Sequence, residues 1–136
     1  MAFPVDIAQV RKTETALDLV FPSSFVERMM RNNGGDLVID GEEWSLHPFL
    51  DTSDRTRLTR TCNDIIRETK SAKAWDAFPR TGVAIGSNGM GDLLVLLPDP
   101  VNAKRLQPAV FMWSHETGEL DVVVHDFREL DRDQGR

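Results

Sequence analysis

The fold is decided by two stretches of the sequence, VAIGSNGMGDLLVLL at residues 83–97 and VFMWSHETGELDVVVHDF at residues 110–127. Each contains two β-prone apolar runs separated by a turn of glycine and polar residues, with no helical pattern between the runs. Strands joined by such short turns pair in antiparallel fashion. Four strands are therefore predicted, over about residues 82–87, 90–97, 109–114 and 120–125.

The loop at residues 86–92, GSNGMGD, is the motif most suggestive of phosphate chemistry. A dinucleotide or P-loop site requires a helix directly after its glycines, because the helix N-terminus holds the phosphate. Here a second apolar strand follows instead. The pattern favours a hairpin turn with Asn88-Gly89 at its tip, and a small-molecule or nucleotide site in this loop stays as an alternative.

Three helices are predicted before these strands. The first covers residues 5–19, and the second runs from a capping box of Ser24 and Glu27 to an Asn-Gly-Gly stop at residues 33–35. The third, over residues 52–73, has apolar residues at helical spacing and a mostly basic opposite face. It is predicted to be the longest amphipathic helix of the chain.

A further hairpin and a short final helix complete the expected elements. Asp40-Gly41 is a favoured turn dipeptide between the apolar runs 37–39 and 44–46. A short helix is expected after Asp126, followed by a frayed polar tail from about residue 131. The sequence therefore predicts one α+β domain over residues 1–136, with a mainly antiparallel sheet of about six strands and helices covering one face.

Composition narrows the class of protein. The chain of 136 residues has a formal net charge of −6, which disfavours direct nucleic-acid binding and favours a basic protein partner. No stretch approaches the roughly 20 apolar residues that cross a bilayer, and the first residues lack a secretory pattern, so a cytoplasmic protein is expected. The single cysteine, Cys62, is expected to pack on the apolar side of the third helix.

Residues that carry chemistry do not form a motif. His47, His115 and His125 lack the paired spacing of metal ligands, and the serines match no nucleophile motif. Without a pocket, the 22 acidic residues cannot be ranked as catalytic pairs. No catalytic, cofactor-binding or metal-binding residue is predicted.

Acidic residues near aromatic ones give the strongest sign of a binding surface. Residues 116–136 contain seven acidic and three basic residues, and acidic residues also flank Trp44. Recognition surfaces combine a desolvated aromatic anchor with charges that steer association. We expect partner contacts from Asp40, Glu42, Glu43, Trp44, Glu116, Glu119 and Asp121, with Trp44, Trp75 and Trp113 in the core as the competing interpretation.

Three blocks of the sequence resemble the SUKH superfamily, which includes many bacterial immunity proteins and the yeast cell-wall-synthesis regulator of the Smi/Knr family. The first is FPSSFV at residues 21–26 leading to Asn-Gly-Gly, and the second is the loop at residues 86–92 with its Gly-Asp. The third is VFMWSHETG at residues 110–118, followed by an apolar strand and Phe127. The sequence departs from the family pattern at Phe21 and in its arginine-rich third helix.

The resemblance implies an α+β domain without enzymatic activity or a cofactor. It implies a protein partner, in many relatives a polymorphic toxin, often a nuclease, whose active site the immunity protein masks. Two alternatives remain: a regulatory scaffold that binds several cellular proteins, and a small-molecule or nucleotide binder. Self-association is left open.

Overall fold

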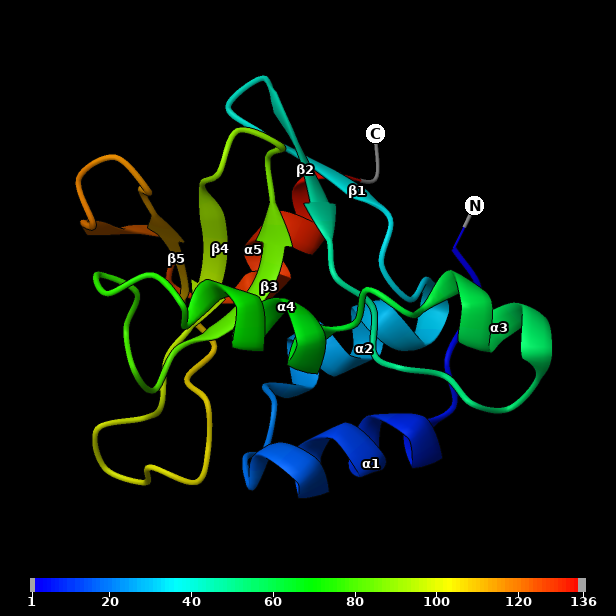
Figure 1. The fold of residues 1–136 in the computed structure, drawn as a ribbon. Helices are drawn as coiled ribbons and strands as arrows, with labels where there is room; N and C mark the ends of the chain where they lie inside the picture. The colour runs from blue at the N-terminus through cyan, green and yellow to red at the C-terminus, as the bar shows by residue number, and fades with distance from the viewer. Residues whose placement is uncertain (1, 135–136) are drawn as a thin grey trace.

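The computed structural model describes residues 2–134 and contains one six-stranded sheet (Figure 1). The strands lie in sequence order and every neighbouring pair is antiparallel. They are β1 (Asp36–Ile39), β2 (Glu42–Leu46), β3 (Val83–Ser87), β4 (Leu93–Leu96), β5 (Val110–Trp113) and β6 (Leu120–Val124). The predicted α+β class with a single antiparallel sheet is confirmed.

Helices pack on both faces of this sheet, so the prediction that they cover one face is wrong. The helices are α1 (Ile7–Leu17), α2 (Ser23–Arg31), α3 (Arg55–Arg60), α4 (Ile65–Ala72) and α5 (Phe127–Asp133). Residues of α1, α2 and α5 join the larger buried cluster, whereas Ala72 of α4 packs in a smaller cluster with Ala84 and Trp113. Figure 1 shows α4 in front of the strands and α5 behind them.

The two clusters explain why β4 is apolar throughout. Leu94 and Leu96 are in the larger cluster, while Val95 between them is in the smaller one. Successive strand residues point to opposite faces, so a strand covered on both faces needs an unbroken apolar run. The run at residues 93–97 correctly indicates a central strand.

The second helix begins differently from the prediction. Its N-cap is Pro22, and no side chain caps it by a hydrogen bond. Ser24 lies inside the first turn, and its Oγ donates a hydrogen bond to Asp126 Oδ1 at 2.9 Å. The predicted capping box is therefore wrong, because Ser24 is used to join α2 to the start of α5. The predicted stop is confirmed: α2 ends at Arg31, and the glycines at 34 and 35 have φ angles of 106° and 79°.

The predicted long helix over residues 52–73 is two short helices, α3 and α4. Thr61 ends α3: its Oγ1 donates to Arg57 O and accepts from Asp51 N. Asp64 then starts α4, because its side chain accepts a hydrogen bond from Ile66 N. Cys62 lies exposed in the break, so its predicted place in the helix packing is wrong.

The end of the chain is ordered further than predicted. Helix α5 runs to Asp133, so it contains the first residues of the expected polar tail, and residues 135–136 lie outside the described part. Within residues 2–134, no helix is both long and apolar enough to cross a bilayer.

Candidate functional site

A hollow of about 480 Å³ opens between the β1–β2 hairpin, β6 and the end of α5. Strands β1 and β6 are at opposite ends of the strand order, yet both line this hollow, so the sheet must curl. Its floor is apolar, formed by Ile39, Trp44, Leu94, Met112, Val123 and Leu130. Its acidic residues are Asp40, Glu42, Asp121 and Asp133. We call this feature, with these ten residues, the acidic hollow.

Three of the acidic residues predicted to bind a partner meet in the acidic hollow. Asp40 and Glu42 come from the hairpin, and Asp121 comes from β6. The sequence analysis missed Asp133, which α5 adds. Among the described residues 2–134, no lysine or arginine lines the hollow, so the field of these residues favours a cationic ligand group.

The other predicted acidic residues lie elsewhere. Glu43 follows Glu42 in β2 and therefore points to the opposite face of the sheet. Glu116 and Glu119 are exposed in the turn between β5 and β6 and do not line the hollow. Their contact with a partner remains a prediction.

The prediction of Trp44 as a surface anchor is wrong. Trp44 is 2% exposed and forms part of the hollow's floor, so its ring cannot insert into another molecule. Trp113 is also core, and its Nε1 donates to Ala77 O at 3.2 Å. Trp75 is the exposed tryptophan, at 56%, and its ring meets Trp113 edge-on at 6.3 Å. Of the three tryptophans, the two in strands are buried.

The glycine loop at residues 86–92 is a hairpin turn whose polar groups bond to one another. Asn88 Oδ1 accepts hydrogen bonds from Met90 N and Asp92 N, at 2.9 and 3.3 Å. Asp92 Oδ1 in turn accepts from His115 N and lies 2.8 Å from His115 Nδ1. These hydrogen bonds from His115 lower the pKa of Asp92. The predicted turn is confirmed, and its side chains hold the β3–β4 turn against the β5–β6 turn.

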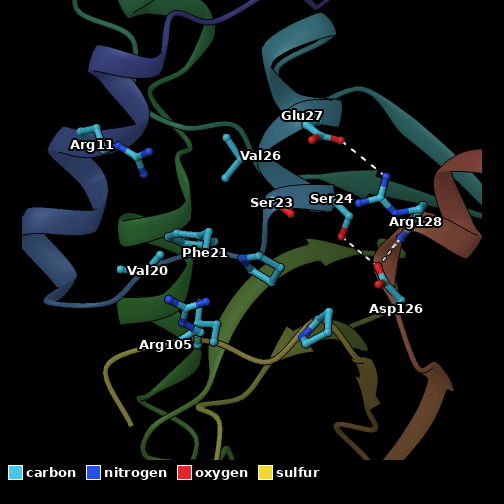
Figure 2. Close-up of a pocket in the computed structure, with 13 residues that line it drawn as sticks. Arg11, Val20, Phe21, Ser23, Ser24, Val26, Glu27, Arg105, Asp126 and Arg128 are labelled. Carbon is cyan, nitrogen blue, oxygen red and sulfur yellow. Dashed lines mark hydrogen bonds and ion pairs between the residues drawn. The ribbon is translucent and has the colours of Figure 1, made fainter. Parts of the chain in front are cut away.

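A second hollow, of about 430 Å³, lies where α1, the start of α2 and α5 come together (Figure 2). Two of its arginines form ion pairs. Arg11 Nη1 lies 2.5 Å from Glu14 Oε1, and Arg128 Nη1 lies 3.7 Å from Glu27 Oε1. Figure 2 shows Ser24 and the Arg128 backbone converging on Asp126. The Arg11–Glu14 pair lies within α1, whereas the Arg128–Glu27 and Ser24–Asp126 contacts join α2 to the start of α5, so the lining has a structural role.

The three histidines do not gather. His47 is 8% exposed, and its Nε2 has no hydrogen-bond partner within the described residues. Burial lowers the pKa of His47 to about 4, so it is neutral at pH 7. His115 pairs with Asp92, and His125 is exposed. Across residues 2–134, no three histidine, cysteine or acidic side chains are placed to share a metal ion.

Comparison with known proteins gives one family. The family model described as the SMI1 / KNR4 family (SUKH-1) matches residues 4–131. This range contains α1 to α4, all six strands and the first five residues of α5. No individual curated protein matches significantly. The match covers the three blocks on which the resemblance was based, and it extends over nearly the whole sequence. The chain therefore belongs to the SMI1 / KNR4 family (SUKH-1).

Proposed function

We propose that this chain is a non-enzymatic protein-binding domain that acts as an immunity protein and neutralises a cognate bacterial polymorphic toxin. The family match supports an immunity or regulatory role. The observation that carries the proposal is the acidic hollow, where four carboxylates surround an apolar floor and the described part of the chain contributes no basic side chain. An apolar patch with a polar rim is typical of a protein-binding surface.

Charge gives the proposal its mechanism. A nuclease toxin binds a phosphate backbone through basic residues, and the carboxylates of the hollow offer the same sign of charge. These carboxylates steer the basic surface toward the hollow, and burial of the half-exposed floor residues Ile39, Met112 and Val123 then slows dissociation. A stable complex of this kind buries on the order of 1,600 Å² in total, so the interface extends beyond the hollow.

A regulatory scaffold is the alternative within the same family match. It uses the same surface but binds several cellular proteins. Affinity purification from the source cells separates the two: one dominant toxin supports the immunity role, and several unrelated partners of similar abundance support the scaffold.

The experiment that tests the immunity role is co-expression with the toxin encoded beside its gene. Wild-type protein is expected to restore growth. The variant Asp40→Lys/Glu42→Lys/Asp121→Lys reverses three charges of the hollow and is expected to lose protection, because the field on the basic partner changes sign.

The matched control is Glu27→Lys/Glu68→Lys/Asp76→Lys, which changes the net charge by the same amount at residues that neither line the hollow nor are predicted to contact the partner. It is expected to keep protection. Equal loss in both variants would show that net charge, rather than the hollow, carries binding. Absence of protection by the wild-type protein would contradict the immunity role.

A further inference from the structure

Strand β1 lies at one end of the strand order, so it forms an edge of the sheet. The backbone N–H and C=O of one of its residues, Val38, face this edge, where a further strand could pair. Asp40 and Gly41, with φ angles of 51° and 80°, form a two-residue turn. Ile39 and Glu42 flank this turn and bond to each other, and hydrogen-bonded pairs alternate along the hairpin. The N–H and C=O of Val38 therefore point away from β2, toward the open edge.

A glutamine side chain occupies this open position. Val38 N donates to Gln134 Oε1 at 2.8 Å, and Gln134 Nε2 donates to Val38 O at 2.8 Å. One amide thus satisfies both the donor and the acceptor of one strand residue. Two residues that exchange both hydrogen bonds are the mark of an antiparallel ladder, whereas a parallel ladder divides the two bonds between different residues. Gln134 takes the place of a residue in an antiparallel partner strand.

This glutamine can leave without loosening its helix. It is the C-cap residue, one position beyond the end of α5. The helix itself is held by Phe127 and Leu130, which are 0% and 4% exposed, and by the ion pair of Asp131 with Arg31 at 2.5 Å. Only the two hydrogen bonds to Val38 need to be exchanged when a strand arrives.

The charges on either side of Val38 differ, and they define the segment that fits. The acidic hollow lies at the Ile39 end, with four carboxylates and no basic residue from the part of the chain that the structure describes. A shallower hollow lies at the Asp36 end, lined by three arginines and two aspartates: Arg28, Arg31, Arg132, Asp36 and Asp131. An antiparallel partner begins at the Ile39 end and finishes at the Asp36 end.

We propose that β1 is a docking edge for an extended segment of the partner protein, which adds as an antiparallel strand and displaces Gln134. The segment carries basic residues in its N-terminal half and acidic residues in its C-terminal half. Main-chain hydrogen bonds supply affinity in this mode of recognition, and the flanking charges select orientation. The inference deepens the proposed function, since it assigns a partner segment to the edge beside the acidic hollow.

The probes are two fluorescein-labelled peptides of identical composition, KVKVTVEVE and its reverse, EVEVTVKVK, measured by fluorescence anisotropy. The first has the proposed charge order and is expected to bind more tightly than the second. Equal affinities, or preference for the reverse order, would overturn the proposed orientation. The variant Val38→Pro lacks the N–H that points to the open edge, and it keeps every hydrogen bond between β1 and β2. It is therefore expected to abolish binding of the first peptide.

The variant Gln134→Ala tests the displacement. It is expected to bind KVKVTVEVE about tenfold more tightly, because two hydrogen bonds of ordinary strength no longer have to be broken. Exchange of the Val38 amide with solvent deuterium is expected to be faster in this variant. The matched control is Gln107→Ala, which removes a glutamine amide that donates to Pro98 O far from β1, and it is expected to change neither quantity.

Unchanged affinity and unchanged exchange in Gln134→Ala would overturn the displacement. The outcome is separable from the proposed function. If neither peptide binds while charge reversal in the hollow still abolishes toxin protection, the docking edge is wrong and the immunity role stands.

Discussion

Two regions on the same face of the sheet differ in how far helices cover them. At one end, α1, α2 and α5 cover the strands, and four phenylalanine rings pack with centroid distances of 5.0 to 5.7 Å: Phe21, Phe25, Phe49 and Phe127. At the other end, α5 stops and the acidic hollow is left open. The first, which we call the sealed region, buries all four rings to 3% exposure or less, and the second collects four carboxylates above an apolar floor. The contrast teaches that this fold completes its core at one end and leaves an open acidic surface at the other, which is the surface that the proposed function uses.

The largest effect on stability is expected from a cavity in the sealed region. Phe25 is 0% exposed and meets three other rings. Phe25→Ala is expected to lower the free energy of unfolding by about 3–5 kcal/mol, since the change removes apolar contacts and leaves a cavity. Urea denaturation measures it. Asp121→Asn in the hollow is the control and is expected to shift the same quantity by no more than about 0.5 kcal/mol.

The next effect concerns a buried titratable side chain, that of His47, which directly follows β2. Burial lowers the pKa of His47 to about 4, below its ordinary value of 6.5. Between these values the unfolded chain binds the proton and the folded chain does not, so stability falls as the pH drops from about 6.5 to 4. The full loss is about 3 kcal/mol, at 1.36 kcal/mol per pKa unit.

His47→Gln is the variant that isolates this loss, because glutamine does not titrate. Its unfolding free energy is expected to vary less with pH over the same window. Chemical denaturation at a series of pH values from 7 to 4 measures the difference. Parallel pH profiles for the two proteins would show that His47 is not the group responsible.

A smaller effect concerns the joint between α2 and α5 within the sealed region. Ser24 Oγ donates to Asp126 Oδ1 at 2.9 Å, across 102 positions of sequence. Ser24→Ala is expected to cost about 1 kcal/mol, the net value of one hydrogen bond. Thermal unfolding measures this, with the exposed Ser23→Ala as control. An equal shift in both variants would show that the serine hydroxyl has no specific role.

The smallest expected effect concerns the acidic hollow, the open region of the comparison. The four carboxylates of the acidic hollow share one sign of charge, so added salt is expected to raise the free energy of unfolding by a few tenths of a kcal/mol through screening. In the variant Asp121→Asn this salt dependence is expected to be weaker. A steeper dependence in the variant would contradict mutual repulsion within the hollow.

The sequence predicted best what short-range patterns determine. The β-prone runs at residues 83–97 and 110–124 located four strands within a few residues, and Asp40-Gly41 located the hairpin. The unbroken apolar run of β4 correctly indicated a strand covered on both faces. Period and turn chemistry are local properties, so one sequence suffices to detect them.

The failures came from partners distant in sequence or from competing local hydrogen bonds. Helical periodicity over residues 52–73 concealed the break that Thr61 and Asp64 impose. Ser24 fitted a capping box, but its partner, Asp126, is at the other end of the chain. Curling of the sheet brings Asp40 and Asp121 to one hollow, and no local pattern encodes that curvature.

Hydrogen–deuterium exchange on a complex with the partner that we propose, the toxin encoded beside the gene, tests the central claim most directly. The acidic hollow as the binding surface predicts slower exchange in the bound state over residues 38–42 and 120–124, with little change over α1 and α3. Protection confined to α1, α3 or the turn at residues 115–119, with the hollow still exchanging as in the free protein, would contradict it.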